Sequence, residues 1–118
     1  MDSRPKTIFC DIDGTLLQHH GDASKQTTED PVLLSGVLKK LKEWDQKGYN
    51  IILVTGRRES CREVTEKQLR KVGIFYDKLI MGIGGGPRVI INDRKPDGQT
   101  TAYSINLKRN GGLDDIKI

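Results

Sequence analysis

Three short polar clusters could carry chemistry, and each of them follows a run of apolar residues. They are Asp11-Ile12-Asp13-Gly14-Thr15, Thr55-Gly56-Arg57 and Asn92-Asp93-Arg94. The carboxylates of Asp11, Asp13 and Asp93 would repel one another unless a cation lay between them, and oxygen ligands of this kind favour Mg²⁺. Thr55 offers a hydroxyl group, and the backbone of Thr55 and Gly56 can present N–H groups to an anion at the start of the following helix. Together these features indicate phosphoryl transfer, with an aspartyl-phosphate intermediate that divides one difficult displacement into two easier ones.

The apolar runs that precede these clusters predict the elements that hold them. Strands are predicted at residues 6–10, 50–54, 78–81, 89–91 and 101–105, and helices at residues 32–47 and 58–72. Alternation of strands and helices predicts a Rossmann-like α/β fold, a three-layer sandwich with a mostly parallel sheet. Because the carboxyl ends of parallel strands share one edge of a sheet, the three clusters are expected to converge there.

The length of 118 residues fits one domain, so we assign residues 1–118 to a single phosphatase domain. Residues 14–31 are polar and typical of a loop, and residues 16–31 leave room for a small flap. The tail, residues 108–118, is expected to be weakly ordered, and Arg109-Asn110-Gly111-Gly112 within it has no clear interpretation.

At this point the sequence resembles the haloacid dehalogenase (HAD) superfamily of phosphohydrolases. Asp11-Ile12-Asp13-Gly14-Thr15 is similar to its DxDGT motif, Thr55-Gly56-Arg57 to its second motif, and Asn92-Asp93 to its fourth, often a pair of acids. The resemblance extends from residue 7 to about residue 97. It implies a HAD-like fold and hydrolysis of phosphomonoesters.

The resemblance also implies a role for each matched residue. Asp11 would be the nucleophile, and Asp13 would protonate the leaving oxygen and later activate water. Mg²⁺ would be held by the Asp11 carboxylate, the main-chain carbonyl of Asp13 and the Asp93 carboxylate. Thr55 and the amide of Gly56 would bind the phosphoryl oxygens.

The sequence departs from the family pattern at two positions. The third motif of the family supplies a Lys or Arg shortly before the fourth strand, whereas residues 82–87 here contain no cation. Arg88 and Lys95 are equal candidates for a phosphate-binding replacement, with Lys71 and Lys78 behind them. The first acid of the fourth motif is Asn92, so Asp93 would have to supply the charged metal ligand.

No insertion is long enough for a cap domain, so the chain resembles capless members of the family. Among these are small phosphatases of sugar-phosphate and capsular polysaccharide metabolism and the phosphatase domain of polynucleotide kinases. We expect a phosphorylated sugar or similar small metabolite as substrate. A phosphorylated polynucleotide end is the alternative substrate. It is less favoured because no aromatic residues, on which bases could stack, lie among the scattered Lys and Arg residues. A non-catalytic binding module with this fold is the third reading, motivated by the absent lysine.

Composition limits the remaining possibilities. Lys and Arg number 20 against 16 Asp and Glu, and the resulting net charge of +4 suits an anionic ligand. Two cysteines do not make a disulfide scaffold, which favours a cytoplasmic location. No apolar run reaches the eighteen residues of a membrane span, so no membrane association is expected. A site without a cap is compatible with a homo-oligomer, in which a second subunit would exclude water from it.

His19 and His20 are expected in a surface loop, and Arg57 is expected to pair with Glu59 or Glu63 at least as readily as with substrate.

Overall fold

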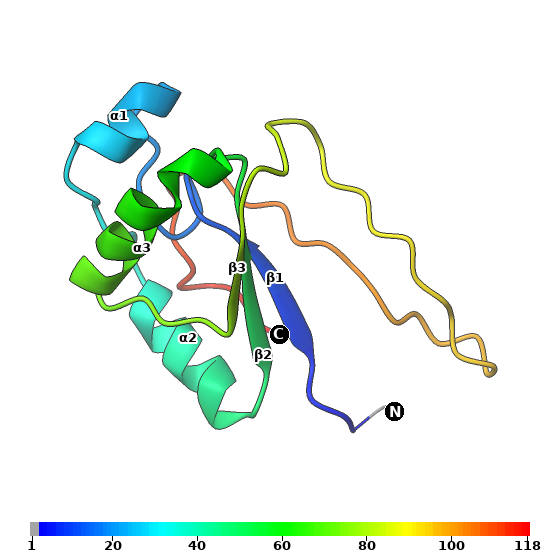
Figure 1. The fold of residues 1–118 in the computed structure, drawn as a ribbon. Helices are drawn as coiled ribbons and strands as arrows, with labels where there is room; N and C mark the ends of the chain where they lie inside the picture. The colour runs from blue at the N-terminus through cyan, green and yellow to red at the C-terminus, as the bar shows by residue number, and fades with distance from the viewer. Residues whose placement is uncertain (1–2) are drawn as a thin grey trace.

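The computed structural model describes residues 3–118, which form a three-stranded parallel sheet with the helices on one side of it (Figure 1). In chain order the elements are β1 (Thr7–Asp11), α1 (Ala23–Thr28), α2 (Val37–Gln46), β2 (Asn50–Val54), the 3₁₀ turn η1 (Glu59–Cys61), α3 (Arg62–Lys71) and β3 (Lys78–Ile80). The predicted α/β class with a mostly parallel sheet is confirmed. None of the helices in residues 3–118 has the length and hydrophobicity needed to cross a membrane.

The sheet has the order β1-β2-β3, and its register aligns the ends of the strands that precede the polar clusters. Asp11 lies opposite Val54, and Val54 lies opposite Ile80. The amide of Thr55 continues the ladder by donating to the carbonyl of Ile80 at 3.0 Å. The first two polar clusters therefore leave neighbouring strands at the same edge of the sheet, as predicted.

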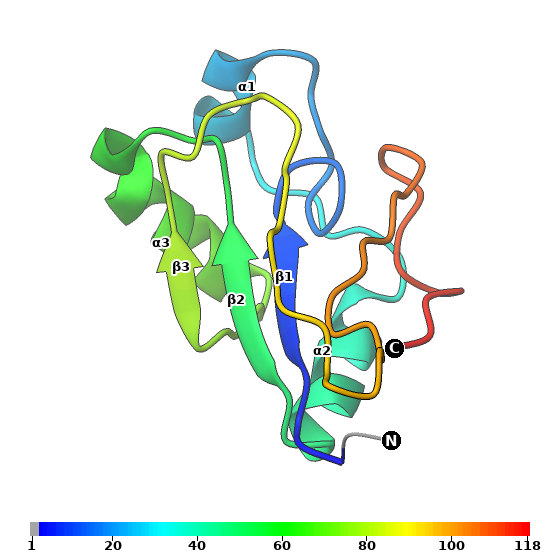
Figure 2. The ribbon, with the colours of Figure 1, turned by 90° about the vertical axis from the view of Figure 1, so that its right-hand side faces the viewer.

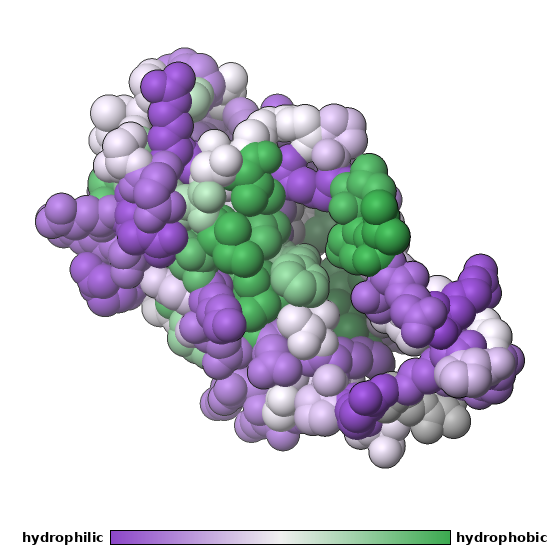
Figure 3. Space-filling view, turned by 45° about the vertical axis from the view of Figure 1, so that its right-hand side comes forward, coloured by the Kyte–Doolittle hydropathy of each residue, from purple (hydrophilic) through white to green (hydrophobic). Residues whose placement is uncertain are grey.

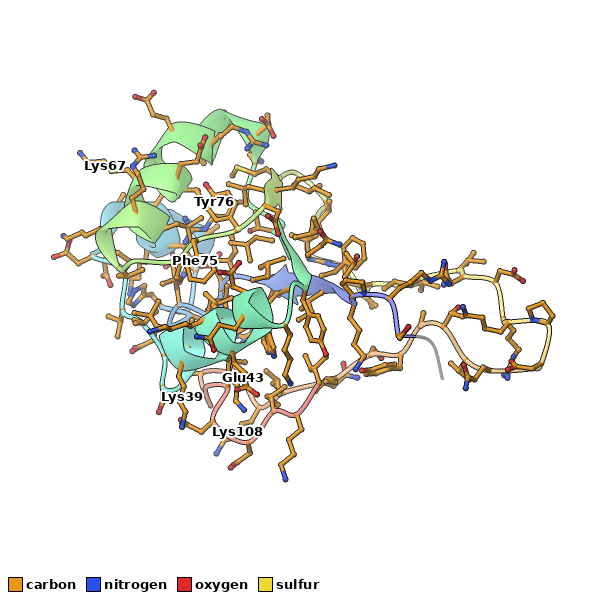
Figure 4. The ribbon with its side chains drawn as sticks, turned by 90° about the horizontal axis from the view of Figure 1, so that it is seen from below. Lys39, Glu43, Lys67, Phe75, Tyr76 and Lys108 are labelled. Carbon is orange, nitrogen blue, oxygen red and sulfur yellow. The ribbon has the colours of Figure 1, made fainter. Side chains whose placement is uncertain are left out.

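The core lies between the sheet and the helices. In β1 burial alternates, so Ile8 and Cys10 face inward while Phe9 is exposed. The helix α2 presents Val37, Leu41 and Trp44 to the sheet at helical spacing, with charged side chains such as Lys39 and Glu43 on its outer side (Figure 4). The largest fully buried side chains include Ile12, Leu16, Leu41, Ile51, Leu53 and Leu69. Each such side chain contributes about 1.5–3 kcal/mol through burial, which fixes the strand ends that carry the site.

A helix forms inside the flap, where the sequence analysis predicted only loop. Asp22 caps α1, because its carboxylate accepts a hydrogen bond from the amide of Lys25 at 2.9 Å. An Asp at the N-cap satisfies one of the amides that the first turn leaves without a partner. The helix buries Gln26 and no apolar residue, so no hydrophobic periodicity was present to predict it.

The strands predicted at residues 89–91 and 101–105 are not formed. Residues 84–106, called the excursion below, leave the domain and return through a turn at Lys95 and Gly98, on the side of the sheet away from the helices (Figures 1 and 2). A parallel strand beside β3 would need a crossover of a dozen or more residues. Only residues 82–87 separate Met81 from Arg88, and six extended residues reach about 20 Å. The prediction followed from β-propensity alone, and within residues 3–118 no strand pairs with this segment.

The excursion carries much of the exposed hydrophobic surface. Val89 is 84% exposed and Ile91 is 94% exposed. Phe9 on β1 and Ile80 on β3 are also exposed, and Figure 3 shows hydrophobic side chains gathered on this face of the molecule. The side of the sheet away from the helices therefore exposes apolar side chains.

The tail, residues 108–118, contains no helix or strand but contacts the core. Leu113 is 2% exposed, and its amide donates to the carbonyl of Ser35 at 2.8 Å. Ile116 and Ile118 also pack against the core cluster. The tail therefore closes the end of the core near the start of α2.

Candidate active site

A tight turn after β1 holds the first pair of carboxylates. The carbonyl of Ile12 accepts hydrogen bonds from the amides of Leu16 and Leu17 at 2.8 and 3.0 Å. Gly14 adopts a φ of +89°, a left-handed conformation that glycine reaches without steric cost, and its amide donates back to the carbonyl of Leu17 at 2.7 Å. Because Ile12 points into the core, Asp11 and Asp13 remain at the edge of the sheet, Asp11 exposed and Asp13 half-buried.

The surroundings of Asp11 raise its pKa above the ordinary value of 3.8. Partial burial of the carboxyl group is the largest cause, and the negative charge of Asp13 adds to it. The amide of Ile12, which donates to Asp11, and the charges of Arg88 and His19 act in the opposite direction. Arg88 and His19 are therefore within electrostatic reach of Asp11.

Arg57 forms a bidentate ion pair with Asp13. Its Nε donates to Oδ2 of Asp13 at 2.8 Å, and its Nη2 donates to Oδ1 at 2.8 Å. The remaining nitrogen, Nη1, donates to Oγ1 of Thr65 at 3.0 Å and to Oε1 of Gln68 at 2.6 Å. The Arg57 side chain is 6% exposed and that of Asp13 is 15% exposed, so this is a largely buried pair. The expectation that Arg57 would pair with Glu59 or Glu63 was wrong, and Glu59 pairs with Arg62 instead, at 2.6 Å.

Two glutamines complete the surroundings of Asp13 and were missed by the sequence analysis. Gln26 of α1 donates from Nε2 to Oδ1 of Asp13 at 2.7 Å. Gln68 of α3 accepts from Arg57 and donates to the carbonyl of Gln26 at 2.8 Å. A signal for Gln68 was present, because it lies four residues after Val64 and four before Val72, at the spacing of one helix face.

Thr55 and Gly56 stand beside the carboxylates, at the end of β2. Thr55 is buried, and its Oγ1 accepts a hydrogen bond from the amide of Arg57 at 3.1 Å. Gly56 is tightly approached by the glycine-rich link, since a Cβ atom at this position would lie 2.6 Å from the carbonyl oxygen of Gly84. Glycine at position 56 is thus required by the close passage of the chain that leads to Arg88.

Four of the remaining predicted residues lie in the excursion, and Arg88 is the one among them whose charge acts on Asp11. Arg88 acts on the charge of Asp11 and donates from Nη1 to the carbonyl of Gly86. Lys95 lies at the turn of the excursion, which projects away from the sheet (Figure 1). Asp93 and Asn92 contact Thr101 of the returning limb. The predicted convergence of Asp93 with Asp11 and Asp13 does not occur, because the strand that should deliver it is not formed.

The donor set expected for Mg²⁺ is accordingly incomplete at this edge. The Asp11 carboxylate and the main-chain carbonyl of Asp13 lie near the turn, whereas the Asp13 carboxylate is occupied by Arg57 and Gln26. Across residues 3–118, no group of three or more His, Cys, Asp or Glu side chains is arranged to hold a metal ion. The residues that meet here thus fit only part of a magnesium site.

The flap and the tail are joined at the turn that holds Asp13. Asn110 donates from its amide to the carbonyl of Gly14 at 2.8 Å and accepts at Oδ1 from the amide of His19 at 2.7 Å. It does so in a left-handed conformation with a φ of +62°. His20, the second histidine of the flap, lies 3.3 Å from Glu29. The segment that had no interpretation from sequence therefore supports both the Asp13 turn and the flap.

Cys10 directly precedes Asp11 and is buried in the core. Burial raises the pKa of its thiol to about 12, and the neighbouring charge of Asp11 adds to the effect. Cys61 is half-buried, and both cysteines are free thiols. Cys10 is therefore a neutral, packed side chain rather than a nucleophile.

The site is an open edge of the sheet. Shallow hollows of about 350 and 240 Å³ occur on α3 and between α1 and α3, and neither is lined by Asp11 or Asp13. The Asp11 side chain is exposed at the end of β1.

Comparisons with known proteins show which chains this one is similar to. Residues 5–86 match the family model described as the polynucleotide kinase PNKP phosphatase domain. A chain in a structure of the Pnkp1/Rnl/Hen1 complex is 38% identical, with a TM-score of 0.59, over 72% of this chain and 30% of that chain. A chain in a structure of the Pnkp1/Rnl/Hen1 RNA repair complex is 43% identical, with a TM-score of 0.58, over 67% of this chain and 26% of that one.

A crystal structure of a target protein from Vibrio cholerae is 23% identical, with a TM-score of 0.54, over 76% of this chain and 81% of that chain, and it supports the fold alone. The search of curated proteins gave no match. The chain spans less than a third of the length of the two repair-complex chains.

Proposed function

Because the chain belongs to the family of polynucleotide kinase PNKP phosphatase domains, within the HAD superfamily, we propose that it is a Mg²⁺-dependent phosphomonoesterase that acts through an aspartyl-phosphate. The observation that carries the proposal is the pair Asp11 and Asp13 at the end of β1, beside Thr55 at the end of β2. All three residues lie within the segment that matches the family.

Asp11 is proposed as the nucleophile. It is exposed, while Asp13 is held by three hydrogen bonds from Arg57 and Gln26, so the two carboxylates are suited to different tasks. Attack of an Asp11 oxygen on phosphorus would form the acyl phosphate as the bond to the leaving oxygen breaks. Asp13 would give its proton to that oxygen and later take one from the water that releases phosphate.

Thr55, Gly56 and Arg88 are proposed to bind the phosphoryl group. The Thr55 hydroxyl is oriented by the amide of Arg57, and it would donate to a phosphoryl oxygen. The amide of Gly56 and the charge of Arg88 would add to this binding, and Arg88 is preferred over Lys95 because its charge already acts on Asp11. Charges and dipoles directed at developing negative charge are the usual source of acceleration in phosphoryl transfer.

Dependence on Mg²⁺ remains part of the proposal. The Asp11 carboxylate and the Asp13 carbonyl would hold the ion, which needs only one or two carboxylates when water and substrate supply its other ligands. When bound, it would neutralise charge on the phosphoryl oxygens.

A phosphorylated polynucleotide end is the substrate class that the comparisons favour. The family description names polynucleotide kinase, and one related structure is titled an RNA repair complex. The open edge admits a large substrate. A phosphorylated sugar or small metabolite, expected from the sequence, is kept as the second candidate because this chain covers less than a third of those relatives.

Phosphate release from a panel of substrates tests the proposal. The panel contains 5′- and 3′-phosphorylated oligonucleotides, nucleotides and sugar phosphates, each with Mg²⁺ and with EDTA, and the control enzyme is Asp11→Asn. We expect Mg²⁺-dependent release that the variant lacks, greatest with oligonucleotides and reduced by added salt. Greatest turnover with a sugar phosphate would select the second candidate. Absence of turnover with every substrate, from folded protein, would leave a non-catalytic binding module.

A further inference from the structure

Gln26 connects the flap to Asp13 through an amide whose orientation is fixed. It is 6% exposed, and its Nε2 donates to Oδ1 of Asp13 at 2.7 Å and to the carbonyl of Gln18 at 3.1 Å. Its Oε1 accepts a hydrogen bond from the amide of His20. The backbone amide of His20 can only donate a hydrogen bond, so it fixes the position of Oε1 of Gln26. The other end of the side chain, Nε2, is therefore directed at the Asp13 carboxylate.

Gln68 of α3 binds the C-terminal end of the flap helix α1 through hydrogen bonds. Its Nε2 donates to the carbonyls of Gln26 and Glu29 at 2.8 and 3.4 Å, at the end of α1, and its Oε1 accepts from Arg57. The two residues that donate to Asp13, Gln26 and Arg57, are thus joined through a third buried side chain. The flap position and the Asp13 carboxylate are parts of one hydrogen-bonded network.

The hydrogen bonds divide the two oxygens of Asp13 unequally. Oδ1 accepts from Gln26 and from Nη2 of Arg57, whereas within residues 3–118 Oδ2 accepts only from Nε of Arg57. A carboxylate has about four acceptor positions, so the remaining one is on Oδ2. A proton placed there displaces none of the three donors, while a proton on Oδ1 would displace one of them.

From this asymmetry, and resting on the proposed function, we propose that Gln26 is a positioning residue that makes Oδ2 of Asp13 the proton-transfer atom. In the first step, the proton on Oδ2 passes to the leaving oxygen as its bond to phosphorus breaks and the bond from Asp11 forms. In the second, water gives a proton back to Oδ2 as its oxygen bonds to phosphorus and the bond to Asp11 breaks. Without Gln26, Oδ1 becomes a second site for the proton and the carboxylate is held by Arg57 alone.

The test compares two substrates that differ in their need for a proton. The leaving group of p-nitrophenyl phosphate departs without protonation, whereas that of phenyl phosphate depends far more on an acid. We expect Gln26→Met, which keeps the length of the side chain but removes its donor, to lower kcat/KM about tenfold for phenyl phosphate and less than threefold for p-nitrophenyl phosphate. Lys25→Met, on the exposed side of the same helix, is the matched control and should change neither value.

Two further measurements keep the test decisive. Gln26→Glu retains an acceptor for the His20 amide but turns a negative charge toward Asp13, and we expect a greater loss with phenyl phosphate than in Gln26→Met. A double-mutant cycle measured by unfolding, with Gln26→Met, Asp13→Asn and the double variant, tests the contact between Gln26 and Asp13 without an activity assay. We expect the shifts of the unfolding midpoint in the two single variants not to add up to the shift in the double variant.

The outcomes separate the two proposals. Equal losses on both substrates in Gln26→Met would overturn the positioning role, even if the wild-type enzyme is active. Additive midpoints in the cycle would overturn it as well. Absence of Asp11-dependent turnover in the wild type would refute the proposed function, and the role of Gln26 would fall with it.

Discussion

The ion pair between Arg57 and Asp13 is predicted to be a major determinant of stability. Replacement of Arg57 by Met removes both hydrogen bonds to Asp13 and leaves that carboxylate with the single donor of Gln26. Removing one partner of a buried pair typically destabilises a protein by about 3–5 kcal/mol. Since 15% of the Asp13 side chain is exposed, the lower end applies, about 3 kcal/mol. For a chain of this length that corresponds to a fall in Tm of about 12 °C.

A double-mutant cycle by thermal and urea unfolding measures the interaction itself. Arg57→Met, Asp13→Asn and the double variant are compared with the wild type, and we expect a coupling free energy of at least about 1.5 kcal/mol. Arg57→Lys keeps the charge without the planar fork, so its stability should lie between those of wild type and Arg57→Met. Arg57→Lys also replaces Arg57→Met in the cycle if Arg57→Met does not fold.

The control is Arg58→Met, which changes an exposed neighbour and should alter stability by no more than about 0.5 kcal/mol. A coupling below about 0.5 kcal/mol would refute the reasoning, because it would mean that the two side chains contribute independently.

Three other perturbations test separate parts of the structure. Asp11→Asn should raise the unfolding midpoint at pH 7, because folding raises the pKa of Asp11 and its ionisation therefore destabilises the folded state. At pH 3 Asp11 is protonated in both the folded and the unfolded state, so the variant should be no more stable than the wild type. Arg88→Met removes a charge that lowers the pKa of Asp11, so the acidic limb of the pH profile of kcat/KM should move to higher pH. An unchanged limb would contradict the electrostatic interaction between Arg88 and Asp11. Leu113→Ala should destabilise the protein by about 2–5 kcal/mol in urea unfolding, and a loss under 1 kcal/mol would mean that the tail does not seal the core.

The part of the fold that the sequence predicted well is the part with strong local patterns. The continuous apolar run at residues 50–54 predicted β2 with its observed bounds, and the run before Asp11 predicted β1 to within a residue at its end. The positions of Asp11, Asp13 and Thr55 followed, because parallel strands end at the same edge of a sheet. For these residues, local propensity and tertiary structure agree.

The remaining features depend on long-range contacts that no local pattern records. Gln26 gave no hydrophobic signal, and it is buried because Asp13 and His20 satisfy its amide. Arg57 had acidic neighbours at helical spacing, yet the bidentate geometry to Asp13 prevails. The apolar residues 89–91 have the composition of a strand, but a strand also requires a neighbour to complete its backbone hydrogen bonds. In the part of the chain that the structure describes, no strand pairs with them.

The burial of Cys10 has a consequence for the behaviour of the site under oxidative stress. Oxidants react with thiolates, and a thiol whose pKa is raised to about 12 is almost entirely protonated at neutral pH. The residue next to the proposed nucleophile therefore adds no oxidisable group to the site, although it is a cysteine. A phosphatase that uses Asp11 in place of a reactive thiolate would retain its chemistry in an oxidising environment, and damage would begin at the more accessible Cys61, directly before α3.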